Sequence, residues 1–81
     1  GLTSAGELKD PKTRLQEYLQ SRQLDLPAYR LVGRSGKEHV SLFSVACDVP
    51  QLALAVIAEG ASVKKAEQAA ARKILAIIEK T

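Results

Sequence analysis

The sequence predicts an α+β fold: a helix, three antiparallel strands and a second helix, with both helices covering one face of the sheet. Three observations predict it. Leu15, Tyr18 and Leu19 recur at helical spacing, residues 39–49 alternate with period two, and an alanine-rich amphipathic stretch begins at Val63. The 81 residues suffice for one small domain.

We expect residues 1–9 to be a linker or tag remnant and residues 10–81 to form the domain. Asp10 is a preferred N-cap, and Pro11 suits the first helical position, where its missing N–H costs nothing. The first helix should then run to about Gln23.

Strands are expected at residues 28–34, 39–49 and 52–59, with a turn at 35–38 and a tight connection at 50–51. The third strand also contains helix-forming Leu and Ala, but it is short and bounded by Pro50 and Gly60.

The second helix is expected from Val63 to about Glu79, after a break at Gly60 and a cap at Ser62. Its buried stripe should comprise Ala66, Ala70, Ile74 and Ile77 or Ile78.

Composition limits the function classes. Cys47 is the single cysteine, so no internal disulfide can form. No signal-like or membrane-spanning stretch occurs, and we expect a soluble cytoplasmic domain without a membrane partner. Because the chain starts at Gly1 and contains no Met, we interpret it as a fragment of a longer protein. The net charge is +3, and no Lys or Arg lies between Lys37 and Lys64.

The start of the second helix could bind phosphate. Gly60 permits close approach of a ligand, Ser62 caps the helix, and Lys64 and Lys65 follow in its first turn. Cations are disfavoured beside the positive end of a helix, so a phosphate partner would explain them. The alternative is that two exposed lysines are simply tolerated.

Two further segments could contact RNA. Thr13, Gln16, Glu17 and Gln20 form a hydroxyl- and amide-rich strip opposite the apolar face, which suits the shallow minor groove of A-form RNA. The turn with Gly36, Lys37 and His39 could enter a second groove. The alternatives are an ordinary solvated helix face and a solvent-facing histidine. A lone His predicts no metal site.

The runs KDPKTRLQEYLQ (9–20) and AEQAAA (66–71), with Tyr29, Gly36, His39, Phe43 and Gly60 between them, resemble the double-stranded-RNA-binding domain of bacterial ribonuclease III over residues 9–79. The resemblance implies an α-β-β-β-α domain that binds duplex RNA by shape. It would touch two minor grooves and the intervening phosphates over roughly 16 base pairs.

The residues that match the family's RNA-binding positions are Thr13, Gln16, Glu17, Gln20, Gly36, Lys37, His39, Ser62, Lys64 and Lys65. The family is the substrate-binding part of an endoribonuclease that processes RNA, including ribosomal RNA. The resemblance implies a homodimeric parent with Mg²⁺ in a nuclease domain outside this chain, and a monomeric isolated domain.

Two positions depart from the family pattern. Lys37 replaces a proline of the turn, which makes the turn less rigid. Val63 takes the first of two places that are usually basic, so we expect one phosphate contact to be lost or taken over by Lys65.

Other functions are weighed against this one. A protein-interaction module of the same fold would expose an apolar patch, for example at Ala53, Ala55 and Ile57. Single-stranded RNA binding needs aromatic residues on the sheet, where only Tyr29 and Phe43 are available, and is rejected. The acidic residues are scattered, so we expect no catalytic residue, metal or cofactor in this chain.

Overall fold

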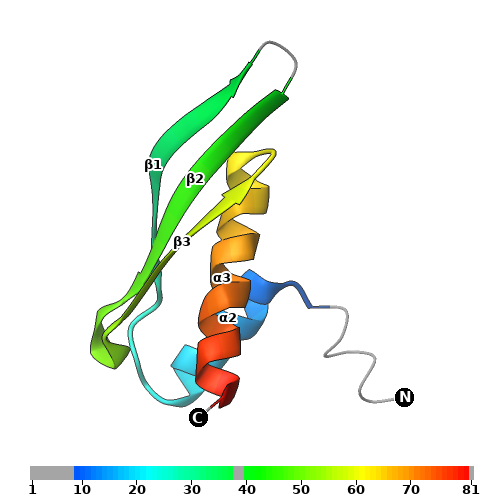
Figure 1. Ribbon diagram of the computed structural model, residues 1–81. Helices are drawn as coiled ribbons and strands as arrows, with labels where there is room; N and C mark the ends of the chain where they lie inside the picture. Colours follow the sequence, from blue (N-terminus) through cyan, green and yellow to red (C-terminus); the bar gives the residue numbers. More distant parts are fainter. Residues whose placement is uncertain (1–8, 38–39, 81) are drawn as a thin grey trace.

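The computed structural model describes residues 9–37 and 40–80, which form two layers (Figure 1). The elements are α2 (Pro11–Ser21), β1 (Ala28–Lys37), β2 (Val40–Val49), the 3₁₀ turn η1 (Pro50–Leu52), β3 (Leu54–Gly60) and α3 (Val63–Lys80). The strands pair antiparallel in the order β1-β2-β3. The predicted α+β fold and element order are therefore confirmed.

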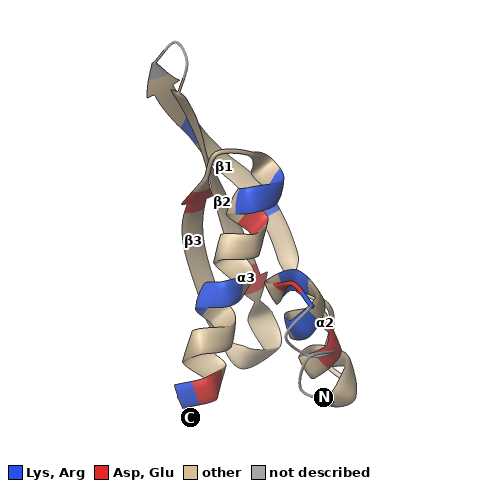
Figure 2. Ribbon diagram, turned by 90° about the vertical axis from the view of Figure 1, so that its right-hand side faces the viewer, with Lys and Arg blue, Asp and Glu red and all other residues tan. Residues whose placement is uncertain are grey.

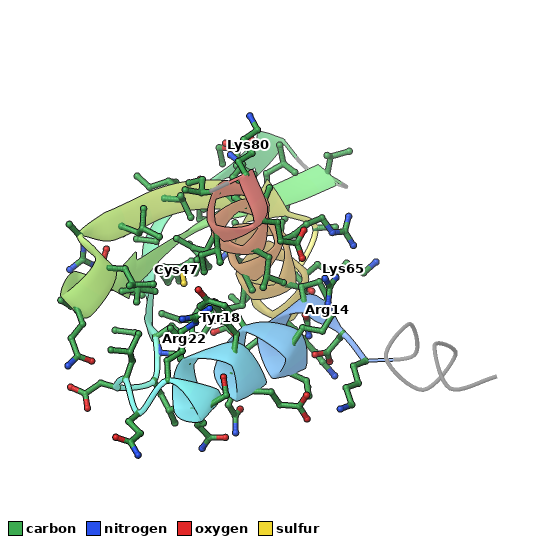
Figure 3. All side chains as sticks on the ribbon, turned by 90° about the horizontal axis from the view of Figure 1, so that it is seen from below. Arg14, Tyr18, Arg22, Cys47, Lys65 and Lys80 are labelled. Atoms are coloured by element: carbon green, nitrogen blue, oxygen red, sulfur yellow. The ribbon has the colours of Figure 1, made fainter. Side chains whose placement is uncertain are left out.

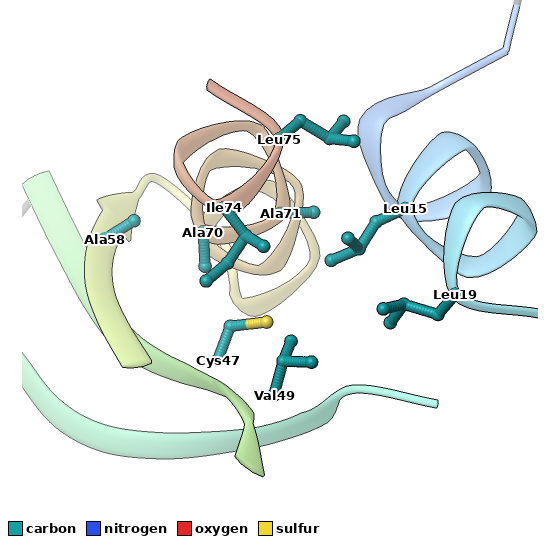
Figure 4. Close-up of a cluster of buried hydrophobic side chains, with 9 residues drawn as sticks. All are labelled: Leu15, Leu19, Cys47, Val49, Ala58, Ala70, Ala71, Ile74 and Leu75. Carbon is teal, nitrogen blue, oxygen red and sulfur yellow. The ribbon is translucent and has the colours of Figure 1, made fainter. Parts of the chain in front are cut away.

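Helix α3 lies directly on the sheet, against β2 and β3, and α2 packs beside α3 (Figure 1). The core fills the space between these three parts, as Figure 4 shows. Its buried members are Leu15, Leu19, Cys47, Val49, Ala58, Ala70, Ala71, Ile74 and Leu75. Because the facing residues of α3 are largely alanines, the helix backbone approaches both the sheet and α2 closely.

The first helix begins as predicted and ends early. The Asp10 carboxylate accepts a hydrogen bond of 2.8 Å from the Thr13 backbone N–H. This bond lowers the pKa of Asp10. The expected end at about Gln23 is wrong, since α2 stops at Ser21. Gln23 adopts a left-handed backbone with φ of 60°, which a continuing helix does not allow.

The predicted turn at residues 35–38 is wrong over its first three residues, because β1 continues through Ser35 to Lys37. Gly36 pairs with Ser41 at φ of 130°, and a side chain there would collide with the Val40 carbonyl oxygen. Glycine often marks a turn, whereas here it allows two strands to approach closely. Glu38 lies outside the described residues, as does His39, with which the second strand was expected to start.

The third strand begins at Leu54, not at Leu52. Leu52 closes the η1 turn, and Ala53 follows with a left-handed φ of 55°, which delays the extended backbone.

The buried stripe of α3 was predicted in part. Ala66, Ala70 and Ile74 are buried and Ile78 is partly buried against the core, but Ile77 is 38% exposed. Ala71 and Leu75 are buried instead, because α2 covers that side of α3 and both side chains point toward it (Figure 4).

Cys47 lies in the core, fully buried on β2 opposite Tyr29 of β1. Burial raises the pKa of the Cys47 thiol, and burial likewise raises the pKa of the Tyr29 hydroxyl. Both groups are therefore held in their neutral forms by the fold.

We predict that the folded chain protects Cys47 from thiol reagents. Its reaction with a disulfide reagent at pH 8 should be at least about tenfold slower than after unfolding in urea, because the thiolate is the reactive form and the sulfur is covered. Equal rates would contradict the packing.

We also predict that stability depends on pH. Since the pKa values of Cys47 and Tyr29 are raised in the folded state, their contribution to the free energy of unfolding should be fully present below about pH 9 and decline as the pH rises further. Urea unfolding at pH 7 and pH 10 measures this decline.

Candidate nucleic-acid interface

The start of α3 is fixed by Gly60 and Ser62. At Gly60, β3 comes so close to α3 that an added Cβ would lie 2.5 Å from the Ala66 backbone nitrogen. The Ser62 hydroxyl accepts a hydrogen bond of 3.1 Å from the Lys65 N–H, and its carbonyl accepts one of 2.9 Å from Ala66. The predicted cap is therefore present.

Lys64 and Lys65 both extend from the first turn of α3 into solvent. Within the described part of the chain neither side chain forms a hydrogen bond, an ion pair or a ring contact. Figure 3 shows Lys65 pointing away from the sheet. Val63, which precedes them, is 36% exposed. The positive end of this helix thus carries added positive charge that no residue described here neutralises.

The polar strip of α2 lies opposite Leu15 and Leu19, as the helical spacing predicts. Its members differ in exposure: Thr13 is half-buried, and Gln16, Glu17 and Gln20 are exposed. The Glu17 carboxylate forms an ion pair of 2.8 Å with Lys9.

The third predicted segment is described in part. Gly36 sits at the far end of the β1–β2 hairpin and is exposed. The backbone of Lys37 pairs with Val40, while the Lys37 side chain and His39 lie outside the described residues. The start of α3 lies between this hairpin end and α2 in both Figure 1 and Figure 2.

A contact that the sequence did not reveal joins α2 to α3. The Lys12 backbone N–H, which has no partner within its own helix, donates to the Gln68 side chain at 3.0 Å. The Lys12 ammonium binds Glu67 at 2.7 Å and lies 4.7 Å from the centre of the Tyr29 ring. Lys12 therefore fixes α2 relative to the start of α3. Glu67 and Gln68 belong to the run 66–71. Because they pair with Lys12 across 55 and 56 residues, no local sequence pattern predicts these contacts.

The part of the chain that the structure describes contains neither a cluster of metal-binding side chains nor a helix that could span a membrane. No three His, Cys, Asp or Glu side chains gather there in a way that could hold a metal ion. Neither α2 nor α3 combines the length and the apolar character needed to cross a bilayer.

Comparison with known proteins decides the family. The family model for the double-stranded RNA binding motif matches residues 11–78. The chain belongs to the double-stranded RNA binding motif family. The resemblance seen in the sequence is thereby confirmed.

Proteins named ribonuclease 3 are similar to this member of the motif family. The one from Colwellia psychrerythraea is 51% identical over 74 residues, which cover 91% of this chain and 28% of that protein. The one from Buchnera aphidicola is 55% identical over 67 residues, which cover 83% of this chain and 30% of that protein. The one from Pasteurella multocida is 52% identical over 71 residues, which cover 88% of this chain and 32% of that protein. The chain thus spans less than a third of the length of these relatives.

Of the apolar residues named for a protein-interaction module, Ala55 and Ile57 lie in β3, whereas Ala53 lies in the turn before it. Ala53 and Ala55 are exposed, and Ile57 is 57% exposed. Arg30 and Asp48 border the same shallow hollow, so charges interrupt the apolar surface. Together with the match to the double-stranded RNA binding motif, this disfavours the alternative.

We predict that Gly60→Ala destabilises the motif by about 1–3 kcal/mol, because the new methyl group would push the first turn of α3 away from β3. Urea unfolding measures the loss. Gly33→Ala is the matched control, since its Cβ would make only ordinary contacts, at 3.7 Å from the Ser44 Cβ. If both variants unfold at the same urea concentration, the tight contact at Gly60 has no energetic consequence.

Proposed function

We propose that this chain binds double-stranded RNA as the substrate-binding domain of a ribonuclease III. The observation that carries the proposal is the match of the motif family over residues 11–78, on a fold whose α3 carries in its first turn two lysines without a partner among the described residues. A duplex is a dense row of phosphates, and unpaired cations at a helix N-terminus are suited to bind them.

Each of the three segments would contact a different part of the duplex. Thr13, Gln16, Glu17 and Gln20 would enter one minor groove, where hydroxyl and amide groups can bond to 2′-hydroxyls and base edges. Gly36, Lys37 and His39 would reach the next minor groove. Ser62, Lys64 and Lys65 would bind the phosphates between them, which agrees with the place of the α3 start between the other two segments.

The ion pair between Lys9 and Glu17 bears on this arrangement. It is exposed at both ends, so it adds little to stability and separates at low cost. Glu17 would then be free to accept a hydrogen bond from a 2′-hydroxyl. Lys9 would become available to a phosphate.

The activity of the whole protein is also part of the proposal. The relatives named ribonuclease 3 are more than three times as long as the matched segment. We infer an endoribonuclease that processes RNA in the cytoplasm, acts as a homodimer, and holds Mg²⁺ in a nuclease domain outside this chain. This chain would contribute binding and no catalytic residue.

A competition assay tests the proposal. Labelled duplex RNA bound to the chain is challenged with unlabelled duplex RNA, duplex DNA of the same sequence and each single strand. Only duplex RNA should displace the label efficiently, because the 2′-hydroxyl and the A-form shape are what the polar strip would recognise. Equal competition by duplex DNA would contradict recognition of shape.

We predict that Lys64→Ala weakens binding to all RNA duplexes by a similar factor and lowers the slope of log K against log salt by about 1. Titrations at several salt concentrations measure both. Arg30→Ala removes the same charge from the outer face of the sheet and should leave the slope unchanged. An unchanged slope for Lys64→Ala would remove this lysine from the phosphate site.

We predict that Val63→Lys strengthens binding and steepens its salt dependence by about 1, because the partly exposed side chain lies in the same helical turn as Lys64 and Lys65. Val63→Gln, which adds polarity without charge, is the control. If neither affinity nor slope changes with the lysine, position 63 does not face the phosphates.

A further inference from the structure

A groove runs along the exposed side of α3 from its first turn to Arg72. It is lined by Lys64, Lys65, Gln68, Ala69 and Arg72, and we call it the α3 groove. We propose that Arg72 binds a phosphate of the RNA duplex together with Lys64 and Lys65, so that the phosphate site extends two turns into α3. The proposal rests on the proposed function, and it adds a residue that the family resemblance does not supply.

Helix geometry brings the cations together. Arg72 follows Lys65 by seven residues, which is almost two full turns, so both side chains leave the same face of α3. Their Cα atoms are separated by roughly 10 Å along the axis. Side chains on a helix tilt toward its N-terminus, so the long Arg72 side chain reaches back toward Lys65. Figure 2 shows basic segments at the start and in the middle of α3.

The floor of the groove leaves room for an anion. Ala69 lies between Lys65 and Arg72 on the helix face and contributes only a methyl group. The side-chain oxygen of Gln68 accepts the Lys12 N–H, and a hydrogen bond from the Gln68 side chain contributes to lowering the pKa of Asp10, so Gln68 is engaged on the side of α2. The groove therefore offers three cations around an open space.

Most of the other cations whose side chains are described have a partner, and the two without one, Arg30 and Lys80, lie on different elements from each other. Lys9, Lys12 and Arg14 are bound to carboxylates, and Lys73 donates to the Ile57 carbonyl oxygen. Arg22 and Arg34 stack on aromatic rings. Lys64, Lys65 and Arg72 share one groove without any such partner in the described structure.

The distribution of charge around the α3 groove favours a bound anion. Glu67, the acidic residue of the same helical turns, is held by Lys12 on the side of α2. The three cations around the groove repel one another, and a phosphate between them would replace repulsion by attraction. The backbone of a duplex that contacts Lys64 and Lys65 supplies phosphates in series, so a neighbouring phosphate can reach Arg72.

The experiment compares Arg72→Gln with Lys73→Gln in the 81-residue chain, using a labelled RNA duplex at several salt concentrations. The two variants lose the same charge at adjacent positions, but Lys73 is engaged by β3. Arg72→Gln should weaken binding about five- to tenfold near 0.1 M salt and lower the salt slope by about 0.7–0.9, as expected for one lost phosphate contact. Lys73→Gln should change affinity less than twofold.

Two outcomes would overturn the inference. If Arg72→Gln and Lys73→Gln weaken binding equally, the effect is one of net charge. If Arg72→Gln binds like the unmodified chain while Lys64→Ala still lowers the slope, the phosphate site ends in the first turn and the proposed function stands. If the unmodified chain shows no preference for duplex RNA, the proposed function itself fails. Arg72→Lys, which keeps the charge, should retain most of the affinity.

Discussion

The close packing of α3 is the constraint on which the rest of the structure depends. Ala66, Ala70 and Ala71 present only methyl groups, so one helix can touch the sheet on one side and α2 on the other. A larger side chain at these places would separate the layers, because protein interiors have little free volume. Gly60 adds the same kind of constraint, since it lets β3 end directly against the first turn of α3. The position of the candidate phosphate site is thus set by alanines and a glycine whose side chains have no group that could bind a phosphate.

A second constraint fixes α2. Apolar contacts of Leu15 and Leu19 hold the helix against α3, but the hydrophobic attraction itself has no direction. The hydrogen bond and ion pair that Lys12 makes with Gln68 and Glu67 are directional, so they select one position. A domain that recognises the shape of a duplex needs fixed distances between its contact segments, and Lys12 provides one of them.

Much of this fold could be predicted from the sequence, because its main signals are local. Asp10 and Pro11 mark a helix start, and the alternation through β2 marks a strand. Some of the errors arose where another part of the chain determines the outcome. Gly36 continues β1 because Ser41 lies opposite, and Ala71 and Leu75 are buried because α2 covers them. The sequence suggested the strip on α2 and the lysines of α3, but the contacts of Lys12 join segments more than 50 residues apart.

The basic residues of this chain fall into two groups that composition cannot separate. Six are bound to carboxylates, aromatic rings or a carbonyl oxygen, and these hold elements together. The others whose side chains are described have no such partner among the described residues, and of these Arg30 and Lys80 lie on different elements from each other. Those around the α3 groove have no such partner in the described structure and add to the positive end of a helix. A net charge of +3 averages over both groups and conceals the second. An interface for a polyanion is therefore better recognised by cations that the fold leaves unpaired in one place than by the overall charge, since the paired ones are already committed to the folded state.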